Sequence, residues 1–174
     1  MTNKSFIILI LLIFNVLNNS CKRSADSEPI RIKAEIKSRI DFDNYQTDKK
    51  PIYLYTQITL INNTDSVLNY WLMSCSWEDN FVFNCNYLNF YFPDCIHNSP
   101  QLSKLLPYES KIFNCIVKLN ENSNNDFKDT CRIGFIFIKD FEYSLTKDSD
   151  FRQLLINKVK RKFVLWSNTF SINN

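Results

Sequence analysis

The segment "IRIKAEIKSRIDF", residues 30–42, alternates apolar side chains with charged or polar ones along its length. A period of two residues is typical of a β-strand with one buried face and one face in water. Antiparallel sheets offer such positions, so this feature favours an antiparallel β fold. The apolar members of the repeat are Ile30, Ile32, Ala34, Ile36, Ile40 and Phe42.

The rest of the chain repeats strand signals at short intervals. Apolar, aromatic and β-branched runs, separated by polar turn residues, occur at 51–61, 67–74, 81–92, 109–119, 131–141 and 161–172. Segment 149–160 instead predicts a short helix, with Ser149 as a candidate N-cap. We therefore predict an all-β fold, an immunoglobulin-like antiparallel β-sandwich with one short helix before the last strand. A partly closed barrel is the alternative. Gly134, the only glycine, predicts a bulge or close packing of an aromatic side chain in the central strand.

The first twenty residues have the features of an export signal. Lys4 precedes the apolar run Phe6–Leu17, which suits a signal peptide and is too short to span a bilayer. Cys21 follows a small residue, as the acylated cysteine does in the bacterial lipobox, which this region resembles. Asn18, however, stands where that pattern prefers leucine. The alternative is an ordinary cleaved signal with Cys21 as one more thiol.

Acylation of Cys21 would define three parts of the chain. These are a signal peptide over residues 1–20, a lipidated N-terminus and tether over 21–29, and a β-sandwich domain over 30–174. Two or more acyl chains on Cys21 would hold the protein stably in a lipid bilayer. Lys22 stands where some bacteria place the aspartate that retains lipoproteins in the inner membrane. We therefore predict a lipid-anchored protein of the bacterial cell envelope, with the outer membrane preferred.

Charge and motif content argue against several function classes. Lys4 is the only charged residue of the signal, so 20 of the 21 Lys and Arg remain against 18 Asp and Glu, without the clustered basic face of a nucleic-acid-binding protein. His97 is the only histidine and no cysteines are spaced C-x-x-C, so we predict no metal site. The sequence has no glycine-rich phosphate loop and no common hydrolase motif. We predict no cofactor, no nucleic-acid partner and no enzymatic activity.

An odd number of thiols remains once Cys21 is acylated. Export to an oxidising compartment favours disulfides, but their connectivity does not follow from the sequence. At least one thiol stays free or pairs between chains. The five cysteines are Cys75, Cys85, Cys95, Cys115 and Cys131.

Three short motifs carry a resemblance to a family. The segment "YWLMSCSW" spans residues 70–77, Cys95 follows it closely before Asn98 and Pro100, and "WSN" spans residues 166–168. With these motifs the chain resembles an uncharacterised family of exported or lipid-anchored bacterial proteins with a YW-x-MSCSW segment. The resemblance implies a shared fold and a Cys75–Cys95 disulfide, and it implies no activity.

Such a bridge is physically reasonable. It would close a loop of about 21 residues, which on the chain-entropy model contributes roughly 3 kcal/mol to stability. Cys85 and Cys115 both occupy apolar-facing strand positions and are our second, weaker pair. Cys131 is then left over, and we expect it to be buried and inert.

Candidate binding residues lie in the segment that the Cys75–Cys95 bridge would close, with Trp77, Phe81 and Phe83 as anchors. The pair Glu78 and Asp79 stands beside an indole, as in sugar-binding and glycosidase sites, although a solvated turn has the same sequence pattern. A basic cluster near the helix end would suit anionic lipid headgroups or a solvated surface. Its members are Lys158, Lys160, Arg161 and Lys162.

From these observations we predict a non-enzymatic binding module of the envelope. Its partners would be the lipid bilayer, through acylated Cys21, and a protein or a glycan. The alternative is an inhibitor of a protease or a cell-wall hydrolase, which would present the Cys75–Cys95 loop to its target.

Overall fold

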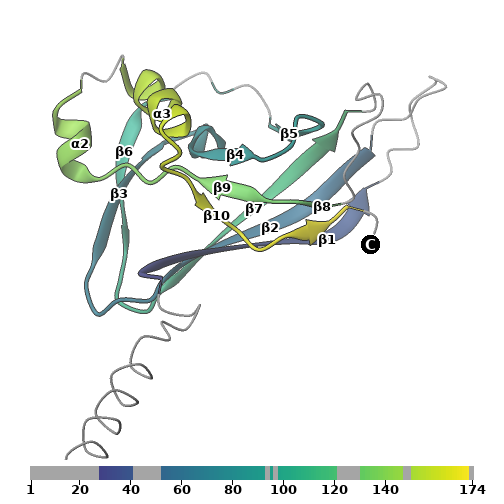
Figure 1. Ribbon diagram of the computed structural model, residues 1–174, viewed down its shortest axis with the longest axis horizontal. Helices are drawn as coiled ribbons and strands as arrows, with labels where there is room; N and C mark the ends of the chain where they lie inside the picture. The colour runs from purple at the N-terminus through teal and green to yellow at the C-terminus, as the bar shows by residue number, and fades with distance from the viewer. Residues whose placement is uncertain are drawn as a thin grey trace, which may run out of the picture.

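The computed structural model describes residues 28–40, 52–92, 95, 98–120, 130–146 and 150–172 (Figure 1). The signal peptide, Cys21, His97 and Ser149 lie outside these residues. Within the described ranges, no helix is long and apolar enough to cross a membrane.

The larger sheet contains four antiparallel strands in the order β1-β2-β7-β5. Ile32 and Ala34 are buried whereas Lys33 is exposed, so the alternation predicted for the first strand is confirmed. The register shifts between Ile36 and Ser38, where a bulge interrupts the alternation. The strands are β1 Ile30–Ile40, β2 Ile52–Asn62, β5 Leu88–Tyr91 and β7 Ser110–Leu119.

Shorter antiparallel strands form the layer that faces this sheet. Strand β9 lies between β4 and β10, β3 pairs with β6, and β8 pairs with β11. Leu54 and Val117 of the larger sheet share one core with Tyr70 and Phe135 of the shorter strands. The predicted antiparallel β-sandwich is therefore confirmed. The strands are β3 Leu68–Met73, β4 Phe81–Phe83, β6 Pro100–Leu105, β8 Thr130–Cys131, β9 Ile133–Phe135, β10 Leu165–Trp166 and β11 Phe170–Ser171.

The helices lie at one end of the sandwich (Figure 1). They are the 3-10 helix η2 (Trp77–Asn80) and the α-helices α2 (Asp140–Ser144) and α3 (Phe151–Lys160). Helix α3 confirms the predicted helix, and it buries Phe151 and Leu155 in a second apolar cluster. Helix α2 corrects the strand expected over 131–141. The Glu142 carboxylate accepts the Lys139 N–H at 2.9 Å, which favours a helix start at this point.

Asn80 connects β3 to the segment after β9. The side chain is fully buried, and its Nδ2 donates to the carbonyl oxygens of Trp71 at 3.0 Å and Ile136 at 3.2 Å. The backbone carbonyl of Asn80 accepts the Ile136 N–H at 2.7 Å. Buried polar groups need such partners, so these bonds fix η2 and β4 beside β9. This placement positions Glu78 and Asp79 of η2, which belong to the site described below.

Gly134 lies in β9, opposite Trp166 of β10. An added Cβ would lie 2.9 Å from two indole carbons of Trp166 and even closer to Cγ1 of Val164. The predicted close packing of an aromatic side chain on this glycine is therefore confirmed.

Candidate functional site

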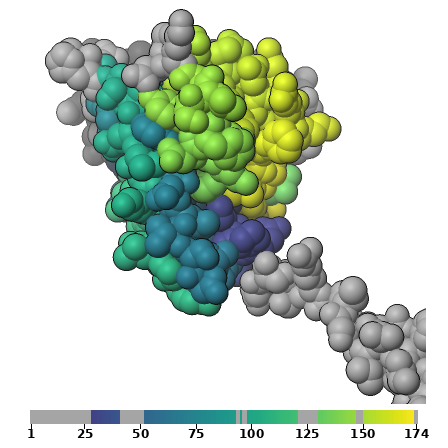
Figure 2. Space-filling view, turned by 90° about the vertical axis from the view of Figure 1, so that its left-hand side faces the viewer, coloured from purple at the N-terminus to yellow at the C-terminus, as the bar shows by residue number. Residues whose placement is uncertain are grey.

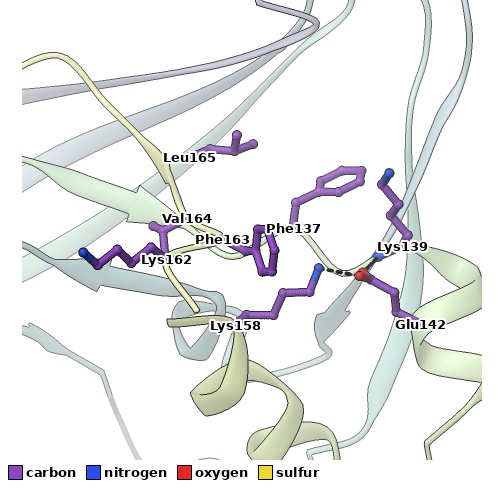
Figure 3. A pocket seen from close by; sticks show the side chains of 8 residues that line it. All are labelled: Phe137, Lys139, Glu142, Lys158, Lys162, Phe163, Val164 and Leu165. Carbon is purple, nitrogen blue, oxygen red and sulfur yellow. Dashed lines mark hydrogen bonds and ion pairs between the residues drawn. The ribbon is translucent and has the colours of Figure 1, made fainter. Parts of the chain in front are cut away.

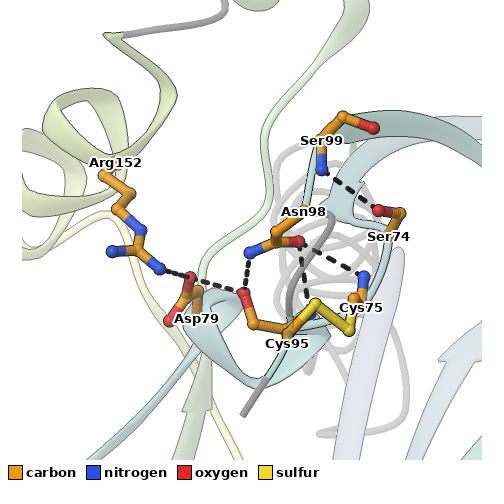
Figure 4. Close-up of a disulfide and its surroundings, with 8 residues drawn as sticks. Ser74, Cys75, Asp79, Cys95, Asn98, Ser99 and Arg152 are labelled. Atoms are coloured by element: carbon orange, nitrogen blue, oxygen red, sulfur yellow. Dashed lines mark hydrogen bonds and ion pairs between the residues drawn. A yellow bond between two sulfur atoms is a disulfide. The ribbon is translucent and has the colours of Figure 1, made fainter.

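The Cys75–Cys95 disulfide is present, with 6.0 Å between the two Cα atoms (Figure 4). Cys75 follows the end of β3 and Cys95 precedes the start of β6, so the bridge closes the segment that separates two paired strands. The pairing implied by the resemblance is confirmed.

Asn98 holds the backbone beside this bridge. Its Oδ1 accepts the N–H groups of Cys75 and Ser76, each at 3.3 Å, and its Nδ2 donates to Ser76 Oγ. Ser74 Oγ accepts the Ser99 N–H at 3.1 Å (Figure 4). These bonds cross between the two ends of the bridged segment and fix its entrance.

A pocket of about 570 Å³, called here the disulfide pocket, opens next to the bridge. Ser76 Oγ donates to Asp79 Oδ2 at 2.7 Å, and Arg152 of α3 reaches the same oxygen at 3.1 Å. The Arg152 side chain is 70% exposed, and such pairs contribute at most about 1 kcal/mol to stability. The guanidinium therefore remains available to a ligand. The pocket is lined by Ser76, Glu78, Asp79, Phe90, Phe92, Cys95, Asn98 and Arg152.

Glu78 and Asp79 line the same pocket in different environments. The Oε2 atom of Glu78 is buried and has no hydrogen-bond partner among the described residues. Burial raises the pKa of Glu78, its own backbone N–H opposes this effect, and the charge of Asp79 adds to the increase. Asp79, in contrast, is held by a hydroxyl and a guanidinium. Glu78 thus keeps a buried oxygen without a described partner, whereas Asp79 is ion-paired and hydrogen-bonded.

The aromatic anchors predicted in the bridged segment mostly point inward. Trp77 packs against Phe81 at 5.4 Å and Phe113 at 4.9 Å between ring centroids. Phe81 is only 4% exposed, which corrects its prediction as a binding anchor. Phe83 is half-buried against Phe90, with ring centroids 4.7 Å apart. These rings build the core edge because the bridge folds them over the larger sheet.

The second cysteine pair predicted from the sequence is not formed. Cys85 and Cys115 both carry free thiols, and the Cys115 thiol donates to the Thr56 carbonyl at 3.4 Å. Burial raises the pKa of Cys115 to about 12. The error arises because Cys115 belongs to β7 of the larger sheet, whereas Cys85 follows β4 of the facing layer. Cys131 is fully buried, as expected.

The basic cluster is only partly available for anionic headgroups. Lys158 pairs with Glu142 at 2.5 Å, and both side chains are largely covered (Figure 3). Lys158 and Glu142 line a shallow pocket of about 410 Å³, and Lys162 and Phe163 line it as well. Lys160, Arg161 and Lys162 are exposed. A contact of these residues with a membrane remains a prediction.

Arg152, Phe90 and Phe92 are site residues that sequence reasoning did not identify. Arg152 lies in α3, which is far along the chain from the Cys75–Cys95 segment, and no local sequence pattern distinguishes it. Phe90 and Phe92 alternate with Tyr91, so their shared face was a detectable signal. Within the described ranges, no group of three or more His, Cys, Asp or Glu residues could hold a metal ion.

Comparisons with known proteins identify no family. No protein-family model matches the sequence, and no curated protein matches it. Among solved structures, the chain is similar to a FixG-related protein from Vibrio parahaemolyticus, with 13% identity and a TM-score of 0.33. The similarity covers 83% of this chain and 96% of that one, and we draw no argument from it. Membership in the family with the YW-x-MSCSW segment therefore stays a prediction.

Proposed function

We propose that this chain is a lipid-anchored envelope protein whose sandwich domain binds a glycan in the disulfide pocket without turning it over. The observation that supports this most is the lining of the pocket, in which half-buried Phe90 and Phe92 stand beside hydrogen-bonding groups. Aromatic rings pack against the C–H faces of sugars, and carboxylates, amides and guanidinium groups bind hydroxyls. The accessible lining of the pocket is mostly polar, which suits a ligand rich in hydroxyl groups.

The pocket lies far from Pro29, near the start of the described domain. The start of the domain is held at the β2–β3 turn, where the Asn63 N–H donates to the Pro29 carbonyl at 3.0 Å. That turn adjoins the Leu68 end of the β3–β6 pair, whereas the pocket adjoins the Met73 end. Five residue steps along β3 separate these ends by about 17 Å. In Figures 1 and 2 the helices lie at the top of the domain and the start of β1 lies below them. A bilayer on the Pro29 side of the domain would therefore leave the pocket uncovered.

Binding is tested with soluble oligosaccharides released from purified cell walls, using calorimetry on the full chain in detergent. We expect Arg152→Gln to weaken binding at least tenfold, because the exposed guanidinium loses its contact with sugar hydroxyls. Arg161→Gln is the matched control, since Arg161 is an exposed arginine that does not line the pocket. No binding by the unmodified chain, or equal losses in both variants, would refute glycan binding at this site.

The same mixtures, incubated and examined by mass spectrometry, separate binding from hydrolysis. Unshortened oligosaccharides agree with the proposal. Shortening that disappears in Glu78→Gln would show instead that the pocket is catalytic.

The anchor is tested by detergent-phase partition of the expressed full chain and of Cys21→Ala. If Cys21 is acylated, only the chain that keeps Cys21 enters the detergent phase. Equal partition of both forms would contradict lipidation. The inhibitor alternative has less support, because Phe81 and Trp77 of the bridged segment pack into the core and are not presented to a target.

A further inference from the structure

Two cysteines outside the disulfide pocket lie just past the paired strands β4 and β9, Cys85 after β4 and Cys131 in β8 before β9. Strands β4 and β9 are antiparallel, with Phe83 opposite Ile133. The pairing continues past the strand ends, because the Asn84 N–H donates to the Arg132 carbonyl at 3.2 Å and the Arg132 N–H donates to Asn84 Oδ1 at 2.6 Å. The next residues in this register are Cys85 and Cys131.

The position within the ladder suits a covalent link. Hydrogen bonds join Asn84 with Arg132 and Asn80 with Ile136, so the register, continued by one residue, places Cys85 and Cys131 at a non-hydrogen-bonded position. In such pairs the Cα atoms lie about 4.5 Å apart and the side chains point to the same face. Disulfides span Cα separations of about 4.4–6.8 Å, so the backbone needs little movement.

We propose that Cys85 and Cys131 are a dithiol modification site, which a small disulfide oxidant converts into a second, cross-strand disulfide. The proposal is independent of glycan binding, because neither cysteine lines the disulfide pocket. It also differs from the Cys85–Cys115 pair expected from the sequence.

The two thiols differ in access, which assigns their roles. Cys85 is half-buried and lines an open pocket of about 720 Å³ with Phe83, Tyr87 and Trp166. Cys131 is fully buried, and its thiol donates to Tyr87 Oη at 3.0 Å. An oxidant of the size of glutathione disulfide can therefore approach Cys85 first, while Cys131 lies behind it.

The chemistry balances with glutathione disulfide as the oxidant. The Cys85 thiolate attacks one sulfur, the oxidant S–S bond breaks, and one glutathione thiolate leaves. The Cys131 thiolate then attacks the Cys85 sulfur of the mixed disulfide and releases the second glutathione. Two protons and two electrons pass from the protein to the oxidant, which becomes two thiols. Burial and the hydrogen bond to Cys131 raise the pKa of Cys85 to about 12, so the first attack is slow at neutral pH.

The test uses the full chain, purified in detergent with the Cys75–Cys95 bridge intact and the other thiols reduced. The folded protein is incubated with glutathione disulfide, alkylated, digested and mapped by mass spectrometry. We expect a cross-linked peptide pair that contains Cys85 and Cys131, with Cys115 recovered alkylated only after unfolding. Cys115→Ala is the matched control, because it removes another buried thiol and should leave the cross-link unchanged.

The variant Cys131→Ala should stop the reaction at its intermediate, with glutathione retained on Cys85 and no cross-link. Cys85→Ser should give neither product. A folded, unmodified chain that yields no Cys85–Cys131 cross-link, or that links Cys85 to Cys115, would overturn the proposal even if a variant fails to fold.

Discussion

Replacement of Gly134 by alanine tests how closely the shorter strands pack. No described glycine has a positive φ, so the backbone at this position is not left-handed. An alanine is therefore disfavoured only by steric contacts of its Cβ. Its Cβ would lie 2.9 Å from Cε3 and Cζ3 of Trp166 and closer to Cγ1 of Val164. Val164 is β-branched and has few alternative rotamers, so its methyl group cannot simply turn away.

The size of the effect follows from two opposing contributions. Gly-to-Ala changes at compatible positions stabilise by about 0.4–1 kcal/mol, because the unfolded chain loses freedom. Overpacking of a well-filled site costs about 1–3 kcal/mol. We therefore expect Gly134→Ala to lower the free energy of unfolding by about 1–2 kcal/mol. For a chain of this size each kcal/mol lowers Tm by about 2–4 °C.

The assay is urea unfolding followed by tryptophan fluorescence, combined in a double-mutant cycle with Val164→Ala. Removal of the Val164 methyl groups should reduce the penalty of the added Cβ by at least about 0.5 kcal/mol, because the two groups compete for one volume. Thr169→Ala, at an exposed position nearby, is the control and should change stability by less than about 0.5 kcal/mol. A neutral or stabilising Gly134→Ala, or strict additivity with Val164→Ala, would refute the close packing.

Three further outcomes are expected. Alanine at both Cys75 and Cys95 should lower the free energy of unfolding by about 3 kcal/mol in urea, and an unchanged midpoint would contradict this. Burial opposes ionisation of Glu142, but hydrogen bonds from Lys158 and a backbone N–H outweigh it and lower its pKa. Its stabilisation is therefore complete above the unfolded pKa of about 4.3 and lost as pH falls through the lower folded value, so Glu142→Gln should flatten the acid side of a Tm-versus-pH curve. Burial raises the pKa of Cys85 to about 12, so its alkylation rate should rise about tenfold per pH unit from pH 7 to 10, without a plateau.

Local periodicity was sufficient to predict most of the strands and α3, because each depends on its own side chains. Strand β6, Pro100–Leu105, lies outside every predicted segment and forms by pairing with β3. The alternation in β1 predicts which residues are buried up to Ile36. It does not predict the bulge after Ile36, because a register shift is a property of two strands and only one is read at a time. The turn into α2 was missed for a different reason: the side chain that favours it, Glu142, lies beyond the apolar run that predicted a strand.

The candidate site was less predictable, because its residues meet through tertiary contacts. The Cys75–Cys95 bridge followed from a resemblance and not from spacing. The wrong Cys85–Cys115 pair followed from a correct observation, that both positions face the core. What the pattern could not show is which layer each strand joins. Arg152 meets Asp79 only because α3 folds back over η2.

The insertion of η2 and β4 beside β9 connects both proposals to one residue. The Asn80 side chain bonds to β3 and to the segment after β9. It therefore fixes the course of the chain both before and after residue 80. Before it, η2 places Glu78 and Asp79 at the disulfide pocket. After it, the β4 register places Cys85 opposite Cys131. A change at Asn80 would therefore disturb both sites together. Arg152→Gln and Cys131→Ala leave the Asn80 hydrogen bonds in place, so each variant tests one proposal, glycan binding or thiol oxidation, without the other.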